Sequence, residues 1–190
     1  MPRSLNNLKT ICKKLLEEIG ENPNRPGLKA TPERMAKMYL EVFKGYDQEQ
    51  MPKVTAFEND DDGIAYNQII CDEGKFNSFC EHHMALFQGT YYFGYIPDKR
   101  IIGLSKIARI VEYYASRMQV QERLGAQIVD YIERKLAPKG VILILKAHHS
   151  CKEVRGVKKE GEMTTSIVRG VFENEPVTRK EFFDLINFNK

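Results

Sequence analysis

The chain has 190 residues, of which 42% are hydrophobic and 29% charged, and its formal net charge at pH 7 is only +3. This length suits one domain with a small appendage and is enough to bury a sizeable core. The mild charge argues against a nucleic-acid partner, which would require a strongly basic surface. The longest apolar stretch, Val141 to Leu145, is far too short to cross a membrane.

The N-terminal residues and the cysteines predict a cytoplasmic protein. Met1 to Thr10 is polar and lacks the apolar segment of a signal peptide. Without export, the four cysteines are expected to be reduced thiols. Cys12 and Cys71 are interpreted as small core residues, and the other two belong to a metal pattern described below.

Two helices are predicted in an N-terminal helical region, residues 1–50. Apolar residues recur at helical spacing over residues 4–19. Thr31 is expected to cap a second helix, with Pro32 at its first helical position. These helices predict a separate layer that serves assembly.

The remaining residues, 51–190, are predicted to form the catalytic domain. Residues 59–63 are acidic and turn-rich, which is typical of a solvated loop. Residues 64–96 have a strand pattern, with turns expected at 72–75 and near Gly89.

Two amphipathic helices follow, one capped by Ser105 and one running from Gln121 to Leu136. The next strand, 141–147, is apolar except for Lys146, which favours burial on at least part of both faces. A last strand is expected over 163–172, followed by a helix with Thr178 in its capping box. Long antiparallel strands with two inserted helices indicate an α+β fold.

Cysteine and histidine recur in two distant stretches, Cys80-Glu81-His82-His83 and His148-His149-Ser150-Cys151. All four histidines of the chain lie in these stretches. Thiolate sulfur and neutral imidazole nitrogen are the usual ligands of zinc. The alternative is that the cysteines are unrelated buried residues and the histidines are solvated.

The best ligand set for one ion is Cys80, His83 and Cys151. A structural zinc site is closed by four protein ligands, whereas a catalytic site keeps one position open for water. The usual second ligand pair of a structural site is missing, so the pattern favours a catalytic zinc over a structural one. His82 and His149 are then candidate proton carriers, because imidazole titrates near neutral pH.

Cations gather at two other places. Lys106 and Arg109 share a face near the start of a helix, where free backbone amides also favour an anion. Arg155 follows the metal motif by four residues. Taken alone, the helix pair is typical of a solvated face, but beside a metal it predicts a phosphate site.

Gln121 and Glu122 begin the second of the two inserted helices. An acid at this position is also favoured by the helix dipole alone. The functional interpretation is a carboxylate that accepts two parallel hydrogen bonds from a planar pair of donors. Guanine offers such a pair at N1–H and its 2-amino group, whereas adenine does not.

Several short motifs follow one another in a definite order and spacing. They are Asn24-Arg25-Pro26-Gly27, Thr31-Pro32-Glu33-Arg34, Cys80 to His83, Gly103 to Arg109, Gln119 to Leu124, His149-x-Cys151, Arg155-Gly156-Val157, Thr164-Thr165-Ser166 and Arg169-Gly170. Together they resemble the GTP cyclohydrolase I family over nearly the whole chain. The chain departs from the family pattern at Leu86, Gly125 and His148, none of which is a presumed ligand.

The resemblance implies the tunnelling fold, in which sheets from several subunits join into a barrel, with an N-terminal helical layer. It also implies a homodecamer with active sites between subunits, and it leaves allosteric regulation open. Members convert GTP to 7,8-dihydroneopterin triphosphate and formate, the first step of folate or tetrahydrobiopterin synthesis.

Carried over residue by residue, the resemblance assigns a role to each candidate. Zinc would be held by Cys80, His83 and Cys151. Proton transfer would fall to His82 and His149, with Ser105 as a helper. Guanine would be held by Gln121 and Glu122, and the triphosphate by Lys106, Arg109 and Arg155.

Three alternatives remain open at this point. A GTP ring-opening enzyme that stops early would keep the zinc and guanine sites and differ in product. A tunnelling-fold relative that acts on a deazaguanine would have little use for the phosphate cations. A zinc-stabilised nucleic-acid-binding module would need a closed metal site and a basic face.

Overall fold

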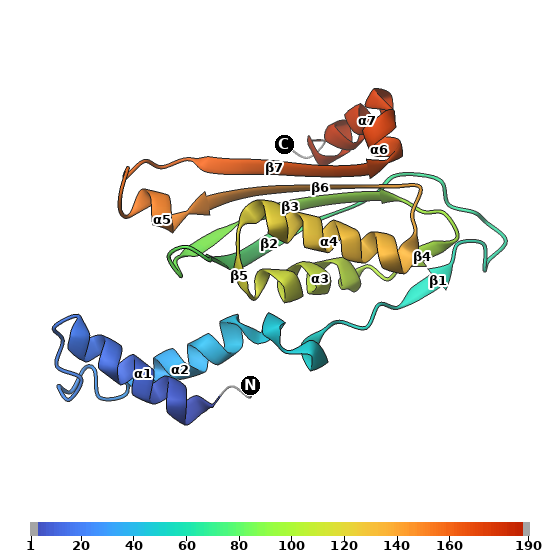
Figure 1. Ribbon diagram of the computed structural model, residues 1–190. Coiled ribbons are helices and arrows are strands. Elements are labelled where there is room, and N and C mark those ends of the chain that lie inside the picture. Colours follow the sequence, from blue (N-terminus) through green and yellow to red (C-terminus); the bar gives the residue numbers. More distant parts are fainter. Residues whose placement is uncertain (1–3, 188–190) are drawn as a thin grey trace.

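The computed structural model describes residues 4–187, and a five-stranded sheet forms their centre (Figure 1). The strand order is β5-β2-β3-β6-β7, and the bounds in that order are Met118–Gln119, Ile70–Cys80, Leu86–Ile96, Gly140–His149 and Glu162–Gly170. The four long strands are antiparallel neighbours, and β5 pairs in parallel with the end of β2. A small ribbon pairs β1 (Ala56–Glu58) with β4 (Arg100–Ile102).

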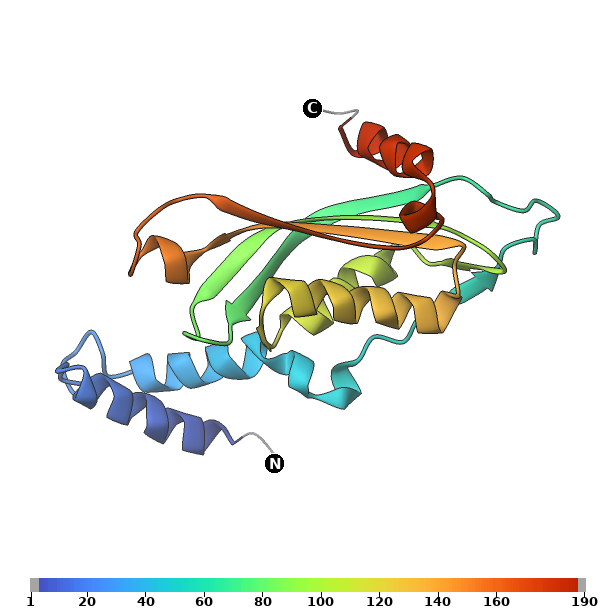
Figure 2. The ribbon, with the colours of Figure 1, turned by 45° about the horizontal axis from the view of Figure 1, so that its top comes forward.

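Two helices, α3 (Ser105–Ala115) and α4 (Gln121–Leu136), cover one face of the sheet in both views (Figures 1 and 2). Their buried apolar stripes face the sheet, with α3 packed on β2 and α4 on β6. The packed set includes Ile110, Leu124, Ile128, Ile132, Val141, Leu143 and Leu145. Removing such side chains from water is the main stabilising term, about 1.5–3 kcal/mol for each.

The opposite face of β6 is covered by α6 (Val171–Asn174) and α7 (Pro176–Asn187). Phe172 and Phe182 pack there against Ile142 and Ile144. The prediction that strand 141–147 is buried on at least part of both faces is therefore confirmed, as is the α+β class with two inserted helices.

The N-terminal helices α1 (Leu5–Glu18) and α2 (Thr31–Val42) pack on each other and lie apart from the sheet (Figure 2). Two single-turn helices, η1 (Lys44–Tyr46) and η2 (Gln48–Gln50), lead from them to the rest of the chain. This is the predicted N-terminal layer. A domain boundary at residue 50 stays a prediction, and residues 1–3 and 188–190 of the two predicted domains lie outside the described residues.

The predicted turns at 72–75 and near Gly89 are wrong, because both segments lie inside long strands. These two glycines allow atoms of neighbouring strands to approach the backbone closely. A Cβ at Gly74 would come within 2.7 Å of the Tyr91 ring, and one at Gly89 would come within 1.9 Å of the Lys146 carbonyl oxygen. Glycine in a strand interior marks such contacts as readily as a turn.

Three predicted helix caps are also wrong. Ala30 and Leu104 occupy the N-cap positions of α2 and α3, so Thr31 and Ser105 are already helical residues. Thr178 lies inside α7, which begins at Pro176, a residue suited to a first helical turn.

Two loop and strand assignments differ in detail. Asn59 is buried, and its amide donates to the carbonyl oxygens of Tyr66 and Asp98, so this end of the acidic loop is anchored. The last strand ends at Gly170, and Phe172 belongs to α6. Among residues 4–187, no helix combines the length and the apolar character needed to cross a membrane.

Candidate metal centre and active site

The two cysteine- and histidine-rich stretches meet at one end of the sheet. β2 ends at Cys80, and β6 ends at His149, where the short helix α5 (Ser150–Glu153) begins. In the β3–β6 pairing, His149 lies opposite Phe87, which is just past the start of β3. This register brings Cys151 beside the loop that joins β2 to β3.

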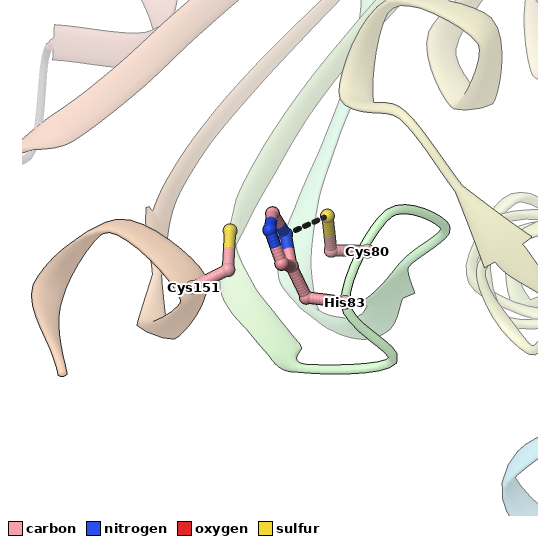
Figure 3. A group of neighbouring side chains, drawn as sticks. All are labelled: Cys80, His83 and Cys151. Atoms are coloured by element: carbon pink, nitrogen blue, oxygen red, sulfur yellow. Dashed lines mark hydrogen bonds between the residues drawn. The ribbon is translucent and has the colours of Figure 1, made fainter. Parts of the chain in front are cut away.

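Three side chains converge there: Cys80, His83 and Cys151 (Figure 3). Their ligand atoms all lie within 4.8 Å of one another, and Cys80 Sγ is 3.8 Å from His83 Nδ1. Zinc bound tetrahedrally to sulfur and nitrogen would set this separation at about 3.6 Å. Two thiols and one imidazole therefore fit zinc in both chemistry and spacing.

The loop after β2 is folded tightly, which is why Cys80 and His83 face the same point. The amides of His83 and Met84 both donate to the Cys80 carbonyl oxygen, at 3.3 and 2.8 Å. Met84 adopts a positive φ of 52°, which is uncommon for a residue with a side chain. Backbone strain of this kind is typical of functional sites, where the surrounding contacts maintain it.

Contacts with neighbouring elements hold both halves of the group. The Glu81 amide donates to the Gln119 carbonyl oxygen, and the Glu81 carboxylate pairs with Arg123 on α4. On the other side, Ser150 Oγ donates to the Leu86 carbonyl oxygen at 2.6 Å. The loop and α5 are thus both fixed to the sheet.

The electrostatic environment of the group is set by burial and by its own thiols. Burial raises the pKa of the Cys151 thiol, and the adjacent Cys80 thiol raises it further. A bound cation would act in the opposite direction, because a metal deprotonates a thiol that coordinates it. Arg155 opposes the rise in the pKa of Cys151, so the predicted cation lies close enough to influence the group.

His149 is held in place, unlike His82. The His149 ring stacks on Phe87 with centroids 4.6 Å apart, and its Nε2 is 2.9 Å from Gln121 Oε1. Burial lowers the pKa of His149, and the Glu122 and Glu153 carboxylates oppose this. The side chain of His82 is 64% exposed, with Nδ1 3.8 Å from Cys80 Sγ.

Gln121 is almost completely buried, with 1% of its surface exposed. Its amide nitrogen faces the carbonyl oxygens of Leu145 and Met163 and the hydroxyl of Thr165. For this side chain to grip guanine, existing hydrogen bonds would have to break. Glu122, the next residue, is exposed.

Sequence reasoning did not foresee that Phe87 and Gln121 position His149. Nothing in the local pattern marks either residue, because their role depends on which strands are neighbours. His148, the first of the two histidines in the second stretch, faces away from this group and contacts Glu153 at 3.0 Å and Glu162 at 3.7 Å.

Comparison with known proteins places the chain in one family. The GTP cyclohydrolase I family model matches residues 8–187. The GTP cyclohydrolase 1 of Mycobacterium tuberculosis is 47% identical over 178 residues, which cover 92% of this chain and 86% of that protein. The chain belongs to the GTP cyclohydrolase I family.

Two further relatives carry the same name. The GTP cyclohydrolase 1 of Streptococcus agalactiae is 44% identical over 175 residues, covering 90% of this chain and 91% of that protein. The GTP cyclohydrolase 1 of Dictyostelium discoideum is 44% identical over 190 residues, covering 98% of this chain and 80% of that protein. Among solved structures, the apo form of the archaeosine synthase QueF-Like aligns with a TM-score of 0.43 at 15% identity, over 52% of this chain and 91% of that one. This last likeness is too weak to define the fold.

In this member of the GTP cyclohydrolase I family, Ser105, Lys106 and Arg109 do not join the metal group within one chain. Ser105 lines a cavity with residues 72–75 of β2, and Lys75 is five residues before Cys80, which corresponds to about 17 Å along a strand. It is the far end of α3 that reaches the metal end of β2, where Ser78 Oγ donates to the Ala115 carbonyl oxygen.

Proposed function

We propose that this chain is a zinc-dependent GTP cyclohydrolase I. It opens the guanine ring of GTP at C8, releases formate and rearranges the remainder to 7,8-dihydroneopterin triphosphate. The observation that carries the proposal is the group formed by Cys80, His83 and Cys151, which stands beside two histidines and a carboxylate. A member of this family with that group has the parts the reaction requires.

The metal would be held by Cys80, His83 and Cys151. Three protein ligands leave a position for water, which distinguishes a catalytic zinc from a structural one. When bound, zinc would supply hydroxide at neutral pH, a nucleophile strong enough for the weakly electrophilic C8.

Guanine recognition falls mainly to Glu122, beside Gln121 at the start of α4. Its exposed carboxylate can accept hydrogen bonds from N1–H and the 2-amino group together, which adenine cannot reproduce. Burial lowers the pKa of His149 and the Glu122 carboxylate opposes this, which supports a role for this negative charge beside the proposed proton carrier. The base would thus be anchored beside the group that acts on it.

His149 and His82 move protons in the successive steps. Ring opening needs a proton at N7, and the later ribose opening and ring closure are also proton transfers. His149 is fixed by Phe87 and Gln121, which suits a step that requires one ring orientation. His82 is exposed and suits exchange of protons with solvent, and Ser105 would assist near the ribose or phosphates.

The triphosphate would be bound by Lys106, Arg109 and Arg155. Arg155 is close to the metal group of its own chain, whereas Lys106 and Arg109 lie on the distant part of α3. The proposal therefore includes a second subunit that brings its α3 to the metal end of the first. One substrate would then contact two chains.

The sheet itself supports assembly. Its outer strand β7, and most of the outer edge of β2, expose backbone groups that natural proteins cover or pair. Pairing of these edges between copies would close a barrel, and the helical layer formed by residues 1–50 would join rings into the homodecamer. Residues 51–190 would carry the site, and the enzyme would act in the cytoplasm.

The decisive experiment identifies the product made from GTP by the purified, zinc-loaded protein. We expect formate and a pterin triphosphate in equal amounts, detected by a formate assay and by pterin fluorescence after oxidation. Cys151→Ala protein serves as the control for contaminating activity. Formate without a pterin would indicate a ring-opening enzyme that stops early, and unchanged GTP would overturn the proposal.

A further inference from the structure

We infer that Gln121 is a positioning residue that holds neutral His149 with its proton on Nε2, so that Nδ1 is the nitrogen that accepts a proton. The catalytic consequence rests on the proposed function. The tautomer itself follows from the hydrogen bonds around Gln121 and does not depend on which substrate the enzyme uses.

The orientation of the Gln121 amide is determined by its surroundings. The atom facing Leu145 and Met163 meets two backbone carbonyl oxygens, at 2.9 and 3.0 Å, and the Thr165 hydroxyl at 3.1 Å. Carbonyl oxygens only accept hydrogen bonds, so this atom has to be the amide nitrogen, which only donates. The reversed amide would set a buried oxygen against two carbonyl oxygens with no hydrogen between them, which is unfavourable.

The remaining atom of the amide, Oε1, therefore faces His149. It lies 2.9 Å from His149 Nε2 and offers only lone pairs, so Nε2 has to carry the hydrogen. A neutral imidazole has one N–H nitrogen and one acceptor nitrogen, and which is which is decided by the hydrogen bond at one of them. Nδ1 is then the acceptor.

The ring cannot turn to evade this assignment. His149 lies directly across from Phe87 in the β3–β6 pairing, and their rings are nearly parallel, with an angle of 4° between the planes. Phe87 is itself fully buried. Stacking fixes the plane of the imidazole, and Gln121 selects the edge of the ring that it binds.

This role separates Gln121 from a direct contact with guanine. A residue that binds substrate raises KM when it is removed, whereas a residue that orients a proton carrier lowers kcat. Gln121→Met keeps the length and apolar volume of the side chain but removes the acceptor at His149. We expect kcat for GTP to fall about tenfold to a hundredfold, with KM changed less than about threefold.

The tautomer is read directly from the protein labelled with ¹⁵N-histidine and loaded with zinc. Solid-state ¹⁵N spectra, which do not depend on the size of an assembly, are recorded at about pH 8, where an ordinary imidazole is neutral. Only four histidines contribute, and the signals of His149 are assigned by their loss in His149→Asn protein. We expect a protonated Nε2 and an unprotonated Nδ1 in the wild type, and a mixture of tautomers in Gln121→Met.

Two further variants separate positioning from simple loss of packing. Thr165→Val removes one partner of the Gln121 nitrogen and leaves the contact with His149, so the wild-type tautomer and kcat should persist. Gln121→Glu still presents an oxygen acceptor to His149 and should recover part of the kcat lost in Gln121→Met.

A protonated Nδ1 in wild-type His149 would overturn the inference, even if Gln121→Met failed to fold. A raised KM with unchanged kcat in Gln121→Met would assign Gln121 to substrate binding instead. If the wild type shows the expected tautomer but does not consume GTP, the proposed function fails and the assignment of the tautomer stands.

Discussion

The metal end of the sheet and the first turn of α3 differ in how completely one chain builds them. At the metal end, Cys80, His83 and Cys151 converge, and His149 has both a stacking partner and a hydrogen-bond partner. At the start of α3, Ser105 and Arg109 are exposed and line shallow parts of the surface. The comparison teaches that a single chain brings the candidate metal ligands together by itself, whereas Ser105 and Arg109 do not lie beside them in the same chain.

Loss of one metal ligand should have the largest effect. Cys151→Ala leaves two ligands, which is too few for tight zinc binding, so the protein should lose its metal and at least about a thousandfold of its turnover of GTP. Metal analysis and kinetics measure both effects. Circular dichroism should show a folded chain, because Cys80 and Cys151 are only two members of the large apolar core formed by α3, α4 and the sheet.

Cys71→Ala is the matched control, since Cys71 is a thiol on the opposite face of the sheet and should leave zinc content unchanged. If Cys151→Ala or a chelator unfolded the chain, the metal would be structural, and the proposed catalytic role of the metal would be wrong.

Glu122→Gln tests the carboxylate at the same end. An amide presents a donor where guanine requires an acceptor and leaves a guanine N–H unpaired, so turnover of GTP should fall by about a hundredfold or more. Steady-state kinetics on GTP measure this. Glu133→Gln, on the same helix but away from the metal, should be close to wild type, and normal turnover by Glu122→Gln would reduce Glu122 to a helix-start acid.

Mixing two inactive proteins tests whether the two regions meet between chains. Cys151→Ala protein lacks a functional metal site, which is one half of the proposed shared active site. Arg109→Ala protein lacks one of the phosphate-binding cations, which belong to the other half. After random exchange of subunits at equal amounts, about a quarter of the sites would combine an intact half from each, so about that fraction of wild-type activity should return.

Each variant exchanged only with itself is the control for the mixing experiment. A fully active monomer in sedimentation velocity would exclude a shared site and break the comparison between the two regions.

The stability of the metal end depends on close backbone packing between β3 and β6. Gly89→Ala would place a methyl group 1.9 Å from the Lys146 carbonyl oxygen, so one strand must move. We expect the free energy of unfolding to fall by about 3 kcal/mol, measured by denaturant titration. Gly103→Ala, whose Cβ would find no atom closer than 3.7 Å, is the control just before α3 and should change little.

Two serines give the smallest contrast. Ser78 is buried and donates to the Ala115 carbonyl oxygen, so Ser78→Ala should cost about 1 kcal/mol of unfolding free energy. Ser105 is exposed and does not cap α3, so Ser105→Ala should cost less than about 0.5 kcal/mol. An equal loss in both would mean that the start of α3 is stabilised as firmly as its end.

Local patterns predicted the helices and the long strands well but misjudged several glycines and caps. The apolar spacing of residues 121–136 and the apolar run at 141–147 correspond directly to α4 and β6. Gly74 and Gly89 suggested turns, although their purpose is to admit a tyrosine ring and a neighbouring backbone. The sequence shows that a residue is glycine, but it does not show which neighbouring atom occupies the space that a side chain would take.

The sequence by itself determined which residues could hold a metal, because cysteine and histidine are the zinc-binding side chains and all four histidines fall in two motifs. It also determined the family, through motifs that keep their order along the chain. Only the tertiary structure decided that β3 and β6 pair with Phe87 opposite His149, and that Gln121 reaches His149 from another element. The physical reason is that ligand chemistry and hydrophobic periodicity are local properties, whereas strand register and buried hydrogen bonds arise between segments far apart in sequence.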